Sequence, residues 1–255
     1  MDAVFRYIDE KCGGVPSPVN LALPLSETLI RIVDMHGLSI DDAREAFKYE
    51  AENYFPFPAG ECVYDLAETD FPTGDNRVEK RFIVAAAKKT LIENTMRAAS
   101  SNGIKLASIE PSQIALERAV SFGNGAGGSC AYIYAGIDRS VLIISWRGSG
   151  VFYNNLSGLG EAAAGAAKSG GDTGAAVSFS CAVRSSLQFA ASQFRSISVK
   201  RGVLFGPSAS PQLCKILFDL LTLESIDLTD VMKARGTDLK DDAGGWETAL
   251  GLALR

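Results

Sequence analysis

Two glycine–serine pairs are the residues whose type and spacing could bind an anion. Gly136 and Ser140 follow the apolar segment CAYIYA, and Gly206 and Ser208 follow the apolar segment VLF. Glycine lets a backbone approach a ligand closely, and the backbone N–H groups of such turns bind phosphate. These four residues could therefore cradle phosphate oxygens. The alternative is that both segments are ordinary β-turns.

Three aromatic residues at 54–57 could contact a partner. Tyr54 and Phe55 precede Pro56, and Phe57 is followed by Pro58, directly after a predicted helix. Aromatic residues are enriched at protein interfaces, so Tyr54, Phe55 and Phe57 could line a groove for a partner peptide. The alternative, which we favour, is that they cap a core at the end of the helix.

The number and spacing of the histidine and cysteine residues exclude several kinds of catalytic and metal site. His36 is the only histidine, so a Ser-His-Asp triad would have to use it, and no nucleophile or orienting acid can be nominated beside it. We therefore expect a solvated turn histidine and no catalytic residue. Cysteines stand at positions 12, 62, 130, 181 and 214, too far apart for a CxxC motif or a zinc ribbon. Reduced thiols in a cytosolic protein are the expected state, and no metal site is predicted.

Composition places the chain among ordinary globular proteins. Its 255 residues, 47% of them hydrophobic, can form a core without disulfides or metals. A net charge of −5 gives no reason to expect binding to nucleic acid or to an anionic membrane surface. No apolar run reaches the roughly 18 residues of a membrane helix. The N-terminal segment MDAVFRYIDEKC mixes charges among its apolar residues, unlike a signal peptide. We expect a soluble protein that reaches a membrane only through a partner.

Hydrophobic periodicity, together with the positions of glycine, proline and helix-capping residues, predicts the helices and strands that must position these residues. Helices are expected over 2–11, 39–55, 88–101, 111–122, 175–196, 211–223 and 246–254. Strands are expected over 19–25, 28–33, 61–69, 78–87, 104–110, 130–135, 140–146, 151–156 and 202–205, with a turn over 70–76. Helices and strands alternate in the first half, and a three-stranded meander opens the second. This order is typical of an α/β or α+β protein with two lobes.

Two glycine-rich stretches divide the second half of the chain. GNGAGG at 123–128 is the best boundary between the lobes. The segment GLGEAAAGAAKSGGDTG at 158–174 has low complexity and is predicted to be a loop, either a disordered linker or a partner-binding switch.

Several segments resemble the PilM-type, actin-like proteins of type IV pilus assembly. LPLSETLIRIVDM followed by LSIDDAREAFKYEAENYFPFP resembles a strand pair and an acidic helix that ends in the family signature, here EAENYFPFP at 50–58. FIVAAAKKTLIENTMRAASSNGIKLASIEPSQIALERAV, CAYIYAGIDRSVLIISWRGSGVFYN, RSSLQFAASQF, VLFGPSAS and ALGLALR resemble later family segments in the family order. The resemblance covers nearly the whole chain.

The resemblance implies a two-lobed actin-like (RNase H-like) α/β fold in a reduced form. The first lobe would span 1–122 and contain an inserted small α+β subdomain over about 28–87. The second lobe would span 123–255 and include the loop at 158–174. The first strand pair of the family is not found before residues 2–11, whether lost or trimmed. The loop at 158–174 replaces the subdomain that covers the nucleotide in relatives.

The resemblance also implies that nucleotide chemistry is lost. A second DxG phosphate motif would fall at 134–136, where Gly136 is kept but Tyr134 occupies the carboxylate position. Gly136, Ser140, Gly206 and Ser208 would then be phosphate-turn remnants or plain turns. Plain turns are favoured because no carboxylate remains to hold magnesium. We expect no cofactor, with ATP and Mg²⁺ conceivable only if the N-terminus is trimmed.

The family further implies a docking function. A groove between the first-lobe core and the inserted subdomain would receive the N-terminal cytoplasmic peptide of an inner-membrane pilus protein. The chain would then be a cytoplasmic scaffold held at the inner membrane by that partner, with self-association left open. Two alternatives remain. The first is an actin-like ATPase or kinase whose first phosphate loop is trimmed. The second is the cytosolic domain of a type II secretion membrane protein, which shares the fold.

Overall fold

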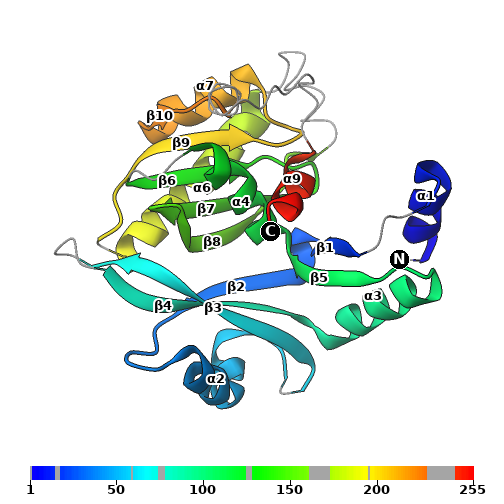
Figure 1. Cartoon of the computed structure of the whole chain (residues 1–255). Helices are drawn as coiled ribbons and strands as arrows, with labels where there is room; N and C mark the ends of the chain where they lie inside the picture. The colour runs from blue at the N-terminus through cyan, green and yellow to red at the C-terminus, as the bar shows by residue number, and fades with distance from the viewer. Residues whose placement is uncertain are drawn as a thin grey trace.

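A computed structural model gives the fold of the chain (Figure 1). It describes residues 2–14, 18–58, 60–73, 78–124, 128–160, 173–194, 196–228 and 245–255. Most of the predicted loop at 158–174 and the middle of the predicted boundary at 123–128 therefore lie outside the described residues.

The larger sheet forms the upper part of Figure 1 and has the strand order β10-β9-β6-β7-β8. Three of its strands form the predicted antiparallel meander: β6 (Ser129–Tyr134), β7 (Arg139–Trp146) and β8 (Ser149–Ser157). β9 (Val199–Phe205) pairs parallel with β6, and β10 (Glu224–Ser225) pairs parallel with β9. The short β10 was not predicted, because two polar residues carry no strand pattern.

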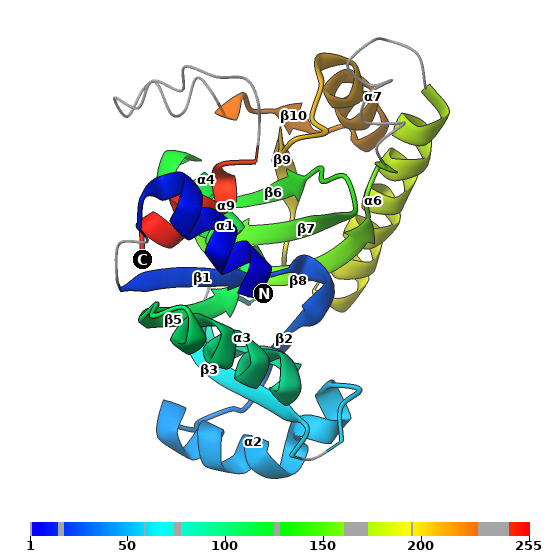
Figure 2. The same cartoon turned by 90° about the vertical axis from the view of Figure 1, so that its right-hand side faces the viewer.

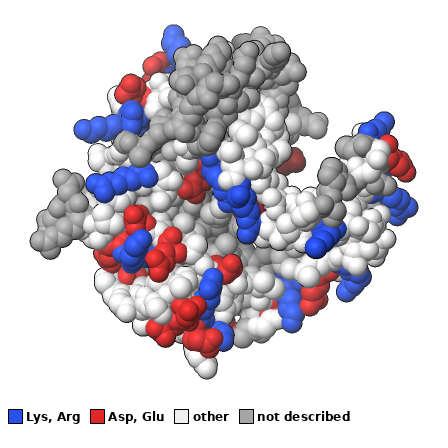
Figure 3. Space-filling view, in the orientation of Figure 1, with Lys and Arg blue, Asp and Glu red and all other residues white. Residues whose placement is uncertain are grey.

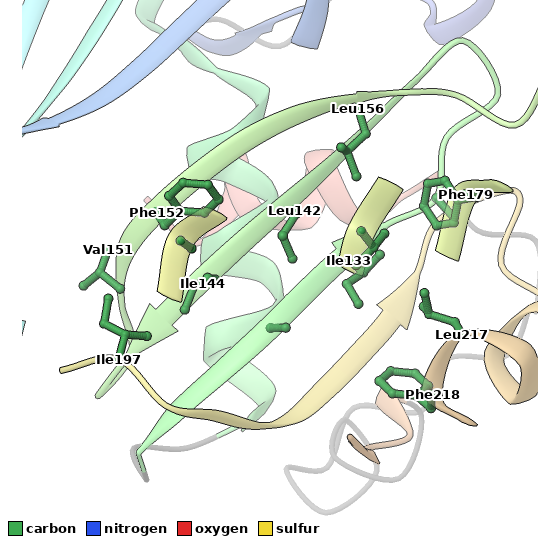
Figure 4. Packing of buried hydrophobic residues seen from close by; sticks show 14 of the residues in the cluster. Ile133, Leu142, Ile144, Val151, Phe152, Leu156, Phe179, Ile197, Leu217 and Phe218 are labelled. Atoms are coloured by element: carbon green, nitrogen blue, oxygen red, sulfur yellow. The ribbon is translucent and has the colours of Figure 1, made fainter. Parts of the chain in front are cut away.

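Helices cover both faces of this sheet. α6 (Thr173–Gln193) and α7 (Pro211–Leu221) pack on the face that carries Ile133, Leu142 and Ile144 (Figure 4). Successive strand residues point to opposite faces. Accordingly, Tyr132, Val141 and Ile143 lie on the other face against Leu116 and Val120 of α4 (Ser112–Asn124). The C-terminal helix α9 (Glu247–Ala253) packs on α4. The predicted helices are confirmed here within a few residues.

The lower part of Figure 1 holds a smaller antiparallel sheet with the order β2-β4-β3. Its strands are β2 (Thr28–Val33), β4 (Val78–Lys88) and β3 (Cys62–Pro72). Helix α2 (Ile40–Tyr54) covers one face, and Ser39 caps its N-terminus by accepting a hydrogen bond from the Asp42 N–H, as predicted. A 3₁₀ turn at Leu25–Glu27 leads into β2.

A two-stranded parallel sheet joins these parts. β1 (Val19–Leu23) pairs with β5 (Leu106–Pro111). α1 (Asp2–Cys12) and α3 (Lys89–Ser101) lie over it, as Figure 2 shows, and Phe5 of α1 is buried against Ala98, Ala99 and Ile104.

The β3–β4 hairpin is longer than predicted. The sequence predicts a turn over Asp70–Asn76, but Asp70, Phe71 and Pro72 continue β3 and pair with Lys80, Glu79 and Val78. The reason is tertiary, because Phe71 is buried in the core of the larger sheet against Phe194, which follows α6, with ring centroids 5.0 Å apart. The prediction for the first three residues of this turn was wrong.

Candidate functional site

The structure brings the four predicted phosphate-turn residues together at the ends of β6 and β9. The Gly136 N–H donates to Ser140 Oγ at 3.1 Å. The Ser208 N–H donates to the carbonyl oxygen of Ala135 at 3.0 Å. Ser140 and Ser208 are both buried. The two turns therefore hydrogen-bond to themselves and to each other.

The side chain of Tyr134 lies between these turns. A Cβ built on Gly136 would lie 2.9 Å from Tyr134 Cε1, and one built on Gly206 would lie 2.9 Å from Tyr134 Cδ2 and Cε2. The phenol ring thus contacts both glycines, and it packs edge-on against Phe205 with centroids 5.6 Å apart. Burial raises the pKa of Tyr134, and the nearby Glu247 raises it further.

These residues do not fit a nucleotide phosphate. Two N–H groups that a phosphate would need, those of Gly136 and Ser208, already donate within the protein. The Ser208 hydroxyl is buried without a hydrogen-bond partner among the described residues. The ring of Tyr134 nevertheless occupies the space between the turns and offers no carboxylate for a metal.

The aromatic residues at 54–57 belong to a core. Phe55 is buried, and its ring centroid lies 6.2 Å from that of Phe47 in α2. Tyr54 stacks on the Phe47 ring with centroids 5.6 Å apart. Phe57 is half-buried and packs against this cluster. The three residues thus hold the end of α2 against the smaller sheet.

A groove lies on the opposite side of that sheet and is the best-formed candidate site. It has a volume of about 610 Å³, within the usual range for ligand sites. β3 and β4 form one side, the end of β5 and the helix α4 form the other, and the β7–β8 turn closes one end. Its apolar lining consists of Leu66, Ala67, Ile83, Ala85, Ile109, Pro111 and Ile114.

Strand alternation explains why the groove is separate from the aromatic core. Tyr64 and Leu66 of β3 point to the α2 side and join the cluster around Phe47. Ala67 and Thr69 are intervening residues, so their side chains point to the groove side. Asp65 lies at the strand edge, where its carboxylate is 3.3 Å from Arg44 Nη2 of α2. The family resemblance implies a groove at this place, but its lining residues were not predicted, because they come from β3, β4, β5, α4 and the β7–β8 turn, which no local pattern connects.

Glu117 is a buried acidic residue that lines the groove. Its Oε1 accepts a hydrogen bond from the Gly150 N–H at 2.6 Å, and its Oε2 accepts one from the Tyr153 hydroxyl. Burial raises the pKa of the Glu117 carboxyl from 4.5 to about 7, although both hydrogen bonds and the charge of Arg118 lower it. The same burial raises the pKa of Tyr153 well above 10. The carboxyl therefore fixes the β7–β8 turn to α4.

Arg118 is a second charged residue of the groove, and it links α4 to β5 and α9. Arg118 Nη1 and Nη2 donate to the two oxygens of Glu110 at 2.8 and 3.1 Å. Arg118 Nη1 also donates to the carbonyl oxygen of Gly251 at 2.7 Å. Arg255 lies 3.6 Å from Glu110. Paired charges thus hold β5, α4 and the C-terminal segment together beside the groove.

His36 lies in a separate surface cluster. Its Nδ1 is 2.6 Å from Asp34 Oδ1, its Nε2 is 2.7 Å from Glu79 Oε1, and its side chain is 73% exposed. Arg81 lies 3.6 Å from Asp34 and 3.9 Å from Glu79, so a guanidinium already supplies positive charge to these carboxylates. We interpret the cluster as surface ion pairs, in keeping with the solvated turn predicted for His36.

The fold is that of the actin-like ATPases. A Bacteroides thetaiotaomicron protein described as having an actin-like ATPase fold and unknown function superposes with a TM-score of 0.50 at 11% identity, covering 99% of this chain and 80% of that one. The similarity is higher to the PilM–PilN type IV pilus biogenesis complex. There the TM-score is 0.76 at 19% identity, with 100% of this chain and 84% of the other covered.

A third similar structure is the cytoplasmic domain of EpsL, an inner membrane component of the type II secretion system of Vibrio cholerae. It has a TM-score of 0.54 at 8% identity and covers 99% of this chain and 79% of the other. No protein-family model and no curated protein matches the sequence. The resemblance inferred from the sequence is thus confirmed for the fold, since identities this low show the fold alone.

Proposed function

We propose that this chain is a scaffold of a type IV pilus or a related secretion machine, and that it docks a cytoplasmic tail of an inner-membrane protein. The observation that carries the proposal is the groove between the β2-β4-β3 sheet and α4, which lies where the family resemblance expects a tail. The likeness to a PilM–PilN complex and to EpsL supports the same class of function.

The groove has the properties of a peptide-binding surface. Ile83, Ala85 and Ile114 are half-buried along its floor, and Ala67 is exposed at its rim. Apolar anchors that enter such a surface supply most of the binding energy of an interface. Tyr54, Phe55 and Phe57, the predicted partner-binding residues, support the sheet from behind it in this proposal.

In the proposed function the protein does not hydrolyse ATP. The support is the ring of Tyr134 between Gly136 and Gly206, where the phosphates of a nucleotide would need backbone N–H donors. The competing function is an actin-like ATPase or kinase that has its first phosphate loop outside the given sequence. It would require magnesium-ATP to bind near these glycines.

The proposed location is the cytoplasmic face of the inner membrane, reached through the partner. Among the described residues, none of the helices has the length and apolar character needed to cross a membrane. Recruitment by a docked tail is therefore the proposed route to the membrane.

A capture experiment tests the docking proposal. Synthetic N-terminal peptides of pilus and secretion membrane proteins encoded near this chain are immobilised, and retention of the full chain is measured. Ala67→Lys introduces a long charged side chain at the exposed rim of the groove and should abolish capture. Ala182→Lys, the same change at an exposed position of α6, should leave capture intact. Equal capture of both variants would place docking elsewhere.

A further inference from the structure

The groove lies between two sheet edges that have no strand partner. β3 is the last strand of the order β2-β4-β3, and β5 is the last strand of the pair β1-β5. Five consecutive residues of β3, from Asp65 to Thr69, line the groove, as do three consecutive residues of β5, from Ile109 to Pro111. A strand that presented only its face would contribute alternate residues. The backbone edges themselves therefore border the groove.

The hydrogen bonds identify which β3 groups point outward. Lys89 N–H donates to the Glu61 carbonyl at 2.8 Å, which makes these two residues a hydrogen-bonded pair of the antiparallel ladder. Such pairs alternate along a strand. Val63, Asp65 and Ala67 consequently bond to β4, whereas the N–H and C=O groups of Leu66 and Glu68 point away from it.

These outward groups are only partly satisfied. The Leu66 N–H donates to Asp65 Oδ1 at 2.8 Å, and the Leu66 carbonyl accepts from Arg44 Nη2 at 3.4 Å, a long contact. Within the described residues, no hydrogen-bond partner is found for the outward N–H and C=O of Glu68. An exposed strand edge of this kind is a template for another strand.

We propose that the groove takes its ligand as an added β-strand on the β3 edge, and that the ligand is an extended, basic segment with apolar residues at alternate positions. The proposal rests on the docking function proposed above. In strand addition, main-chain hydrogen bonds supply affinity and alternate side chains supply specificity. The Leu66 and Glu68 backbones would bond to the ligand, with Arg44 and Asp65 moving aside.

The side chains around the edge determine the chemistry of the ligand. On the groove side, Ile83, Ala85 and Ile114 form an apolar floor. The charged side chains Glu110, Glu117, Arg118 and Arg255 also line the groove, and the two arginines are beside the carboxylates. On the α2 side the net charge is negative. Glu68 is exposed there with Lys80 3.9 Å away, and α2 carries five acids against Arg44 and Lys48. Figure 3 shows acidic side chains gathered over the lower part of the molecule, where α2 and the hairpin lie. Apolar residues thus suit one face of the added strand and basic residues the other.

A second copy of this chain fits the edge poorly. Edge-to-edge pairing would bring Asp65, Glu68 and Asp70 of both copies together, and like charges across a strand pair are destabilising. A membrane-protein tail meets the charge requirement, because cytoplasmic segments beside membrane helices are rich in Lys and Arg.

The probe for this proposal is a nine-residue peptide of alternating Val and Lys with capped ends. Residues that face each other across an antiparallel pair share one face of the sheet, so Val residues on the groove floor place the Lys residues opposite Leu66 and Glu68. The Lys amides then bond to β3. N-methylation of the Lys amides should weaken binding to the full chain about tenfold or more. N-methylation of the Val amides, which point away from β3, should weaken it far less.

Protein variants provide the matching test. Proline is tolerated at edge-strand positions where the N–H faces outward, so Glu68→Pro removes the Glu68 N–H and retains the β3–β4 ladder. Its control, Glu68→Ala, removes the carboxylate alone. We expect Glu68→Pro to lose about tenfold more affinity for the probe than Glu68→Ala. In the wild-type complex, hydrogen exchange of the Leu66 and Glu68 amides should slow.

The outcomes separate the two proposals. Equal affinity for both methylated peptides, or no detectable binding of the unmethylated probe, would overturn strand addition. If natural tails are captured and Ala67→Lys abolishes capture while exchange at Leu66 and Glu68 is unchanged, docking stands and strand addition fails. If Ala67→Lys leaves capture of natural tails intact while the probe protects these amides, the edge binds strands but the natural tails dock elsewhere, and docking in this groove is overturned.

Discussion

At the scale of single residues, Glu117 shows how the groove is built. Its carboxyl is buried and bridges α4 to the β7–β8 turn through Gly150 and Tyr153. Glycine is required at 150, since a Cβ there would lie 2.6 Å from Glu117 Oε2 and 2.0 Å from the Tyr153 hydroxyl oxygen. A buried carboxyl is costly to ionise, so this contact makes the stability of the protein depend on pH.

The first prediction concerns that dependence. The pKa of Glu117 is about 7 in the folded protein against 4.5 for the free carboxyl. The folded state therefore binds more protons than the unfolded state between these values, and the free energy of unfolding should fall as pH rises from 4.5 to 7. The full change in the free energy of unfolding over this pH interval is on the order of 3 kcal/mol. Urea unfolding at pH 5 and pH 7.5 measures the difference.

The matched variant is Glu117→Gln, which keeps the shape of the side chain and cannot ionise. The difference in unfolding free energy between variant and wild type should change with pH across this window, in favour of the variant as pH rises. Parallel pH profiles of the two proteins would show that Glu117 does not titrate as described.

At the scale of elements, the β3–β4 hairpin joins the smaller sheet to the larger one. Arg81 of β4 lies over the ring of Phe71 at 3.9 Å and within 5.9 Å of the ring of Phe194. Ser196 Oγ donates to the Pro72 carbonyl at 2.6 Å. The two sheets are therefore tied at this end of the hairpin as well as through α4.

The second prediction tests that tie. Arg81→Lys keeps the positive charge and loses the planar group that stacks on Phe71. Because lysine does not reproduce such stacking, we expect a loss of about 1 kcal/mol in the free energy of unfolding. Lys80→Arg, on the neighbouring exposed residue, serves as control and should be nearly neutral. Equal stability of wild type and Arg81→Lys would argue against a stacking contribution.

The third prediction concerns the contact between α4 and α9. Alanine normally stabilises a helix relative to glycine by about 1 kcal/mol. At Gly251, however, a Cβ would lie 1.8 Å from the Ala115 carbonyl oxygen. Gly251→Ala should therefore destabilise the protein, by about 1–3 kcal/mol as for other overpacked contacts. Thermal unfolding followed by circular dichroism measures the effect, and a raised melting temperature would contradict it.

At the scale of the whole molecule, the actin-like fold is kept while a side chain occupies the space between the two glycine–serine turns. The two turns that hold Gly136, Ser140, Gly206 and Ser208 meet in the structure, and the ring of Tyr134 lies between them. A fold can be retained while its original site chemistry changes, so function must be argued from the site. In the proposed function, the groove and not the pair of turns binds the ligand.

The fourth prediction follows from this arrangement. Isothermal titration of the full chain with magnesium-ATP should show no binding tighter than a Kd of about 1 mM. That Kd corresponds to a binding free energy of roughly −4 kcal/mol. The Tyr134 ring and the internal bonds of Gly136 and Ser208 are the physical reason. Micromolar binding, or electron density for ATP or ADP beside Tyr134, would revive the ATPase alternative.

Most helices and strands could be predicted from the sequence, because the residues that start and end them are close together in the chain. Ser39 with Asp41 and Asp42 predicts the start of α2 through capping, and the glycines between apolar runs predict the meander. The lobe boundaries at 122 and 123 stay a prediction. α4 (Ser112–Asn124) runs across that boundary and packs on the larger sheet that follows it.

The position of the candidate site could not be predicted from the sequence, because it depends on how the elements pack together. Whether Phe55 faces a partner or a core depends on what α2 packs against, and the answer is Phe47 and the smaller sheet. Asp65, Glu117 and Gly150 are far apart in sequence and meet only when β3, α4 and the β7–β8 turn come together. Periodicity records which face of an element is apolar, whereas a groove depends on which elements become neighbours, and that is set by packing across the whole chain.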